Sequence, residues 1–299
     1  MTLLMFFQCE VYPTNDFASP AALGQQQTRP ILTCLYLQKR ATLMPMLISL
    51  NYAIFALAMY LSVDLFRRPK RFREAATHMA LFSIAALLGG FAHHMEAEQA
   101  AVNRFLFEVN QFLPNHSQAG SFRSVFLRLW LATFFAIGLT EYYFMRIFLH
   151  PLAERYGFRW IKACLVISLL VFCCASLLIS QYSLVVVFHL FTHLLVIGFS
   201  LYLIFVQGLR LFWQLIALVT LNLIAGGVWS LMALGSLPTG PLHYNDWYHI
   251  IILVFLVYLH WVLTKGGLVD ALHSLTPRSV SSNQTALRVP VSTPAPSGD

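Results

Sequence analysis

Long apolar runs separated by short polar segments dominate the sequence. A helix needs roughly 17 to 25 mostly apolar residues to cross the hydrocarbon core of a bilayer. Seven runs reach that length: 44–66, 76–95, 125–147, 160–180, 183–206, 211–235 and 246–264. Each is predicted to be a helix, because an open sheet would leave backbone groups unpaired in lipid. The pattern predicts an all-α, polytopic membrane bundle of about seven transmembrane helices. Only Gln181 and Tyr182 separate the fourth and fifth runs, so six or eight spans are alternatives.

The segments outside these runs divide the chain into a central membrane domain, residues 44–266, and two tails. Residues 267–299 are rich in Ser, Thr, Pro and Val. Such a composition cannot bury a hydrophobic core, so we predict a disordered C-terminal tail. Residues 1–43 hold one short apolar stretch without the basic segment of a signal peptide. We predict that they form a poorly ordered N-terminal tail.

Composition and charge support a membrane protein. Hydrophobic residues make up 58% of the 299 residues and charged residues only 10%, whereas about a quarter of a soluble domain is charged. The formal net charge of +7 arises mostly from short basic runs between the apolar segments, where the positive-inside rule accounts for them. We therefore expect membrane lipid, and no nucleic acid, as a partner.

The basic runs also predict an orientation. One lies between the first two spans, from Arg67 to Arg73, and another between the third and fourth, from Arg146 to Lys162. Loops rich in Lys and Arg stay on the cytoplasmic side. Alternation of the spans then places the N-terminus outside and the C-terminus in the cytoplasm.

Polar residues on the second span identify one candidate helix face. Ser83, Gly90 and His94 recur at helical spacing, so they share that face. Small residues let another backbone approach closely. We therefore expect this face to point into the bundle, with His94 rather than His93 directed inward.

The seventh span opens with a second set of polar residues. Asp246 and His249 stand three positions apart, on the same side of the helix. Because the second span ends and the seventh begins on the predicted outer side, His94, Asp246 and His249 are expected at one depth. Ionisable residues inside a membrane are costly and usually functional, and imidazole with carboxylate is a donor set for metals.

The fifth span contributes His189 and His193, whose i, i+4 spacing can chelate one metal ion from one helix. We predict His189, and next His193, as additional ligands of the outer cluster. Hydrogen bonding between helices is the alternative role for this pair. Glu141 lies toward the cytoplasmic half of the third span, and we expect it to stand apart from that cluster.

The Gly-Gly-Phe-Ala-His-His segment ending at His94, with Asn-Asp-Trp-Tyr-His from Asn245 to His249, resembles an uncharacterised family of multi-pass membrane proteins. More distantly, residues 44–266 resemble the alkaline-ceramidase-like superfamily, which includes the progestin and adipoQ receptors. The resemblance implies seven helices and zinc-dependent amide hydrolysis of lipids. It implies Ser83 and His94 as the second-helix pair and His249 as a last-helix zinc ligand. Asp246 replaces the histidine expected there, and carboxylate oxygen is an accepted zinc donor.

These observations leave several functions open. The leading hypothesis is a metal-dependent membrane hydrolase that cleaves an amide or ester bond in a lipid-like substrate, with zinc as cofactor and Ser83 and Asp246 as catalytic residues. A haem-binding redox protein is the first alternative, because histidines on neighbouring membrane helices can serve as axial ligands. A proton-coupled transporter that uses the His and Asp groups as a relay is the second. A receptor or structural membrane protein is the third.

The predicted orientation can be tested by cysteine-accessibility labelling. A cysteine placed in residues 96–124 should react with a membrane-impermeant maleimide in intact cells, and one placed in residues 67–73 should react only after lysis, because basic loops are retained inside. Opposite sidedness of both loops would refute the orientation.

Overall fold

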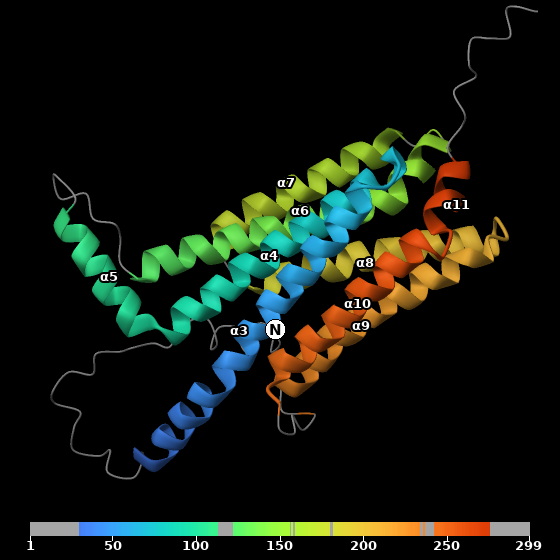
Figure 1. Ribbon diagram of the computed structural model, residues 1–299. Coiled ribbons are helices and arrows are strands. Elements are labelled where there is room, and N and C mark those ends of the chain that lie inside the picture. The colour runs from blue at the N-terminus through green and yellow to red at the C-terminus, as the bar shows by residue number, and fades with distance from the viewer. Residues whose placement is uncertain are drawn as a thin grey trace, which may run out of the picture.

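The computed structural model describes residues 30–112, 122–155, 157, 159–179, 182–233, 236 and 242–275 (Figure 1). All regular secondary structure in these residues is helical. Seven helical segments in this part of the chain are long and apolar enough to span a membrane. The structure therefore confirms the predicted all-α fold and the predicted number of seven spans.

The spans agree closely with the apolar runs of the sequence. They are Met46–Phe66, Lys70–Ala97, Phe122–Pro151, Trp160–Ile179, Leu184–Phe205, Arg210–Met232 and Tyr244–Thr264. The helices and 3-10 turns that contain or connect them are α3 (Pro30–Phe66), η2 (Lys70–Phe72), α4 (Arg73–Ala97), α5 (Gln99–Phe112), α6 (Phe122–Arg155), α7 (Arg159–Ile179), α8 (Tyr182–Phe205), η4 (Arg210–Phe212), α9 (Trp213–Ala233), α10 (Tyr244–Thr264) and α11 (Leu268–Leu275).

Both predicted tails meet helices at their inner ends. Residues 30–43 of the predicted N-terminal tail lie in α3, and residues 268–275 of the predicted C-terminal tail form α11. Leu268, Val269 and Leu272 of α11 are buried, because this short helix is amphipathic and covers the end of α6. The remaining tail residues, 1–29 and 276–299, lie outside the described residues.

Six of the spanning helices form a closed ring, in which each helix packs against its two neighbours in the order α3, α4, α6, α8, α9 and α10. The seventh, α7, lies outside the ring, where it packs mainly on α6 (Figure 1). The main hydrophobic core lies within the ring, and its largest fully buried side chains include Phe144, Phe212 and Phe255.

The chain reverses direction between α10 and α11 at Gly267, whose φ of 72° falls in the left-handed region. A residue with a Cβ is strained there, whereas glycine adopts this conformation readily. The turn lays α11 beside η2, where Arg71 forms an ion pair of 3.1 Å with Asp270. A single glycine thus lets the C-terminal helix fold back over one end of the bundle.

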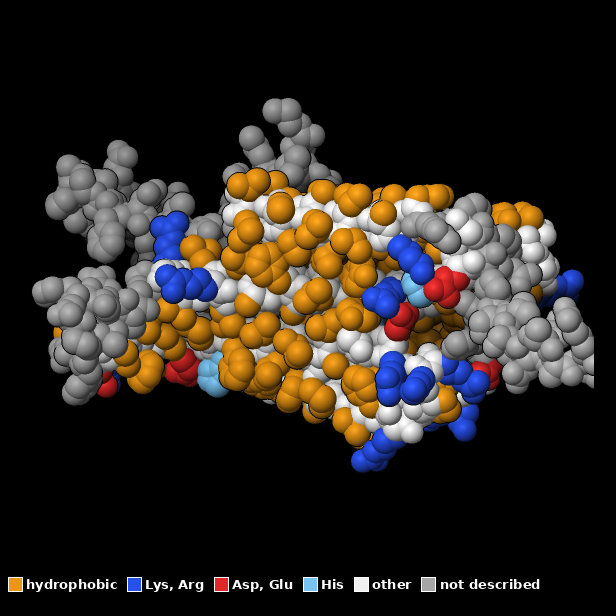
Figure 2. Space-filling view, turned by 90° about the horizontal axis from the view of Figure 1, so that it is seen from above, with side chains coloured by type: hydrophobic (Ala, Val, Ile, Leu, Met, Phe, Trp, Pro, Cys, Tyr) orange, Lys and Arg blue, Asp and Glu red, His pale blue; other side chains and the backbone are white. Residues whose placement is uncertain are grey.

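The surface of the bundle has the polarity expected in lipid. Large apolar side chains are exposed along the spans, most of all on the peripheral helix α7, where Leu178 is 86% exposed. Figure 2 shows hydrophobic side chains covering the middle of one face, with Lys and Arg gathered toward its ends. An apolar girdle between charged ends is the arrangement that a bilayer requires. The protein is therefore an integral membrane protein.

Gly138 of α6 lies in close contact with α7. A Cβ on Gly138 would lie 2.5 Å from Cε1 of Phe172, and this ring is itself stacked on Phe188 of α8 with centroids 4.4 Å apart. The aromatic ring therefore cannot move aside easily. Glycine at position 138 allows the peripheral helix to pack at this distance.

Gly138→Val should destabilise the bundle by about 1 to 3 kcal/mol, the usual cost of inserting methyl groups into a packed contact. Gly198→Val is the matched control, because Gly198 is exposed on α8 and a Cβ there would meet nothing within 4 Å. Thermal unfolding of detergent-purified variants measures the difference. Equal melting temperatures for the two variants would contradict the close contact.

Candidate metal centre

Three potential metal ligands meet between α6 and α8. Glu141 lies on α6, and His189 and His193 lie one turn apart on α8. One ligand atom from each residue lies within 4.8 Å of the ligand atoms of the other two. Among the described residues, these three form the group of His and carboxylate side chains that could hold a metal ion. Glu141 and His193 lie at a similar depth in the membrane. Glu141 stands ten residues before the end of its span at Pro151, and His193 stands twelve residues before the end of its span at Phe205.

The carboxylate of Glu141 is the hub of the cluster. Its Oε1 accepts a hydrogen bond of 2.7 Å from Nδ1 of His189, and its Oε2 accepts one of 2.5 Å from the hydroxyl of Thr192. Nδ1 of His193 lies 3.6 Å from Oε2. Glu141 is 6% exposed, so these groups replace the water that a carboxylate would otherwise bind. The carboxylate therefore ties α6 to α8.

His193 extends the network to α9. Its Nδ1 lies 2.9 Å from the carbonyl of His189, and its Nε2 lies 2.9 Å from Nδ2 of Asn222. These contacts fix the ring orientation, with Nδ1 on the side of Glu141 and Nε2 on the side of Asn222. His193 is 1% exposed. Three ring helices, α6, α8 and α9, thus contribute polar groups to one buried network.

Aromatic packing and two unpartnered atoms surround this network. The ring of Phe144 stacks on His193 with centroids 5.1 Å apart, and it also packs against the ring of His78 of α4, at 5.5 Å. His78 donates from Nδ1 to the carbonyl of Thr140. Nε2 of His78 and Oδ1 of Asn222 are buried and have no hydrogen-bond partner among the described residues. Buried polar atoms of this kind usually have a ligand, an ion or an ordered water nearby.

One side of the cluster reaches the outer surface of the helices. The side chain of His189 is 24% exposed, whereas those of Glu141 and His193 are 8% and 1% exposed. The neighbouring residues Leu190 and Phe191 are exposed and apolar, so this part of α8 would face lipid. The cluster is therefore buried on the ring side and open on the lipid side.

The donor set suits a divalent transition metal. Two imidazoles and one carboxylate form a common catalytic zinc site, which leaves the fourth position to water or substrate. Two tetrahedral bonds of about 2.1 Å place ligand atoms about 3.4 Å apart. A bound cation would replace the proton shared by His189 and Glu141, and their 2.7 Å contact would open by roughly 0.7 Å.

The structure groups the predicted metal ligands differently from the sequence prediction. His189 and His193 meet in one cluster, but they join Glu141 rather than the outer residues. Glu141 does not join the outer residues, in keeping with its expected place toward the cytoplasmic half of its span, and the two histidines of α8 lie with it instead. His78 and Asn222 were not predicted to take part. A buried acid in an apolar span was the signal for Glu141.

The face of the second span that carries Ser83 is a helix contact. Ser83 is fully buried and its hydroxyl donates to the carbonyl of Phe55 on α3, 2.9 Å away. A Cβ on Gly90 would lie 3.2 Å from atoms of Asn51 and Tyr52, also on α3. The predicted inward face therefore points at the neighbouring helix. This geometry gives Ser83 a packing role, and its catalytic role stays a prediction.

The inward orientation of His94 was wrong. His94 is exposed, and its Nδ1 lies 3.5 Å from the hydroxyl of Tyr52, because the face that it shares with Gly90 runs along α3. His93 is the half-buried histidine, and its ring packs edge-on against Trp130 of α6. His93, rather than His94, also lies within electrostatic range of His249.

Asp246 and His249 mainly serve the start of α10. Asp246 is fully buried, and its Oδ2 accepts from the backbone N–H of His243 at 3.0 Å, which completes a capping box. His249 donates from Nδ1 to the carbonyl of Asn245 at 2.5 Å. Neither joins a set of three potential ligands with His94 in the described part of the chain. The predicted outer metal site is therefore not assembled by these three residues.

Comparison with protein-family models, curated proteins and solved structures found no match. The assignment of the site consequently depends on the geometry of the chain itself.

Ser83→Ala should separate packing from chemistry. Loss of the hydroxyl leaves the carbonyl of Phe55 without this donor, so the bundle should lose about 1 kcal/mol of stability. Metal content should stay unchanged, since Ser83 does not belong to the cluster of Glu141. Thermal unfolding and elemental analysis of the same preparation test both parts. A loss of metal at unchanged stability would support the predicted catalytic role.

Proposed function

We propose that this protein is a metal-dependent membrane hydrolase whose cation, zinc by donor type, is held by Glu141, His189 and His193. The observation that carries the proposal is the convergence of these three donors, one carboxylate and two imidazoles, inside the membrane-spanning region. A cation bound there makes a water molecule nucleophilic at neutral pH and polarises a carbonyl oxygen. The reaction class is cleavage of an amide or ester bond.

The exposure of the cluster favours a lipid-like substrate. His189 is the ligand on the outer side, and the exposed residues beside it are apolar. A substrate would approach from the bilayer rather than from water. The resemblance to the alkaline-ceramidase-like superfamily implied the same reaction class. Here the proposed metal ligands come from the third and fifth spans instead of the second and seventh.

Haem is a poorer fit to these histidines. The ring centroids of His189 and His193 are 3.9 Å apart, which leaves no room for a macrocycle between them. Axial ligands must approach the iron from opposite faces of that macrocycle. The pair can therefore hold a small ion but cannot bracket a haem.

Proton transfer is the second candidate, favoured by a specific observation. Hydrogen bonds join Glu141 to His189 and Thr192, and join His193 to Thr192 and Asn222, so three titratable groups of α6 and α8 lie in one hydrogen-bonded chain that ends at the amide of Asn222 on α9. Chains of acids and histidines of this kind serve as proton relays in pumps and transporters. In that case the cluster would carry protons without a metal.

Metal content distinguishes the two candidates. Protein purified in detergent and loaded with Zn²⁺ should bind close to one ion per chain, and Co²⁺ in its place should give the visible spectrum of a tetrahedral site. His193→Gln should weaken binding by more than about 100-fold, since changes one shell further out already cost 10- to 100-fold. His94→Gln is the matched control, because His94 is exposed and outside the cluster.

Unchanged Zn²⁺ affinity in His193→Gln and Glu141→Gln would refute the metal site. Hydrolysis is then tested with fluorescent long-chain amides and esters in mixed micelles. Turnover that disappears with a chelator and returns with Zn²⁺ supports the hydrolase. Binding of one zinc ion per chain with no turnover of either amides or esters would support the metal site and refute the hydrolase.

A further inference from the structure

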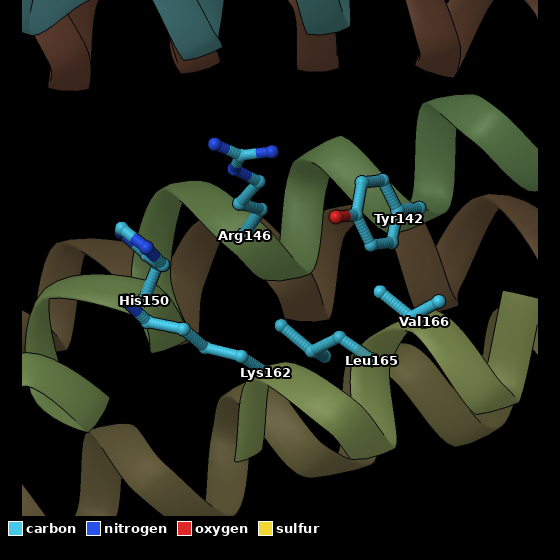
Figure 3. Close-up of a pocket in the computed structure, with 6 residues that line it drawn as sticks. All are labelled: Tyr142, Arg146, His150, Lys162, Leu165 and Val166. Atoms are coloured by element: carbon cyan, nitrogen blue, oxygen red, sulfur yellow. The ribbon is translucent and has the colours of Figure 1, made fainter. Parts of the chain in front are cut away.

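A basic cavity lies between α6 and α7, at the end of the bundle opposite to the start of α8. Figure 3 shows Tyr142, Arg146 and His150 along α6 and Lys162, Leu165 and Val166 along α7, with Lys162 extending toward His150. The cavity has a volume of about 150 Å³, which is room for several water molecules or one phosphate group. Neither the hydrolase proposal nor the metal cluster uses these residues.

The cavity lies at the membrane boundary. Arg146 and His150 belong to the last turns of a span that ends at Pro151, and Lys162 belongs to the first turn of the span that begins at Trp160. The exposed ring of Trp160 marks the same level, as aromatic residues do at membrane interfaces. A headgroup in the adjoining leaflet would reach the cavity without leaving the bilayer.

Two carboxylates hold the basic side chains in place. Nε of Arg146 donates to Glu74 at 2.7 Å, and Nζ of Lys162 donates to Glu154 at 3.0 Å. His150 lies 3.6 Å from the same oxygen of Glu154. The contacts with Glu74 and Tyr142 use two of the five N–H donors of the guanidinium, and the contact with Glu154 uses one of the three donors of the ammonium. The cavity thus presents positioned donors from two helices, and Arg146 matches the oxygens of a phosphate.

The far side of the cavity is apolar and faces lipid. Val166 is 44% exposed, and the exposed residues Leu170 and Val171 continue along α7 toward the middle of the membrane. Acyl chains can lie along this surface while a phosphate occupies the basic end. A free phosphate would gain nothing from the apolar side.

We propose that the cavity between α6 and α7 binds the phosphate headgroup of an anionic phospholipid, with Arg146 and Lys162 as its principal contacts. The basic loop between residues 67 and 73 belongs to the same end, because Glu74 follows it directly and pairs with Arg146. That end is the predicted cytoplasmic one, where anionic lipids are concentrated.

Lipid binding is measured on the full chain by native mass spectrometry from detergent, with phosphatidylglycerol and phosphatidylcholine in competition. Phosphatidylglycerol should be retained preferentially, and each basic residue removed should weaken its binding by about fivefold. The test variant is Arg146→Gln with Lys162→Gln. The control is Arg67→Gln with Lys265→Gln, which removes the same charge from exposed positions at the same end. If the double variant fails to fold, Lys162→Gln alone is the test variant, because it leaves the ion pair of Arg146 with Glu74 intact.

Three outcomes would overturn the proposal. The first is equal retention of phosphatidylglycerol by the test and control variants. The second is equal retention of the two lipids by the unaltered protein. The third is displacement of phosphatidylglycerol by millimolar inorganic phosphate as effectively as by the lipid, which would identify free phosphate as the ligand.

Discussion

Polar groups inside a bilayer have no water to bind, so each must find a partner on another helix or on its own backbone. The cost of an unpaired ionisable side chain there is at least about 2.5 to 3.5 kcal/mol. This constraint explains the arrangement of the ring better than hydrophobicity does, because lipid is as apolar as the side chains of the core. Apolar side chains alone would not determine which helices become neighbours.

Each pair of neighbours in the ring shares at least one polar contact. They are Ser83 with the carbonyl of Phe55 (α4 to α3), Arg146 with Glu74 (α6 to α4), Glu141 with His189 (α6 to α8), Asn222 with His193 (α9 to α8), Trp229 with Asn245 (α9 to α10) and His260 with Asp64 (α10 to α3). The contacts close a circle through six helices. The outer helix α7 is joined to α6 near its start, where Lys162 meets Glu154, and otherwise by aromatic and small-residue packing such as Phe172 on Gly138. Hydrogen bonds between helices thus specify the order of the ring, and shape specifies the position of α7.

The number and the limits of the spans could be predicted from the sequence, because hydrocarbon thickness sets the length of an apolar run. The partners of each polar residue could not. Periodicity places Ser83, Gly90 and His94 on one face but does not say whether that face meets a neighbour or the centre, and here it meets α3. The depth and polarity of their residues also suggested that spans two, five and seven share a site. The fold instead brings α6 beside α8 and leaves α7 outside, so His189 and His193 meet Glu141.

The contact between α6 and α8 differs from the other five in composition. Serine hydroxyls on backbone carbonyls join α3 to α4, and one indole on one amide joins α9 to α10. Between α6 and α8 the chain instead buries a carboxylate with two imidazoles, three groups that can each carry charge, where a single neutral pair would hold the helices together. Replacing buried ionic groups by apolar ones is often neutral or stabilising, so structure alone does not require Glu141, His189 and His193 at one point. A bound cation, or a proton that moves among them, provides a reason for all three, and this excess over what packing needs is the physical argument that the cluster is functional.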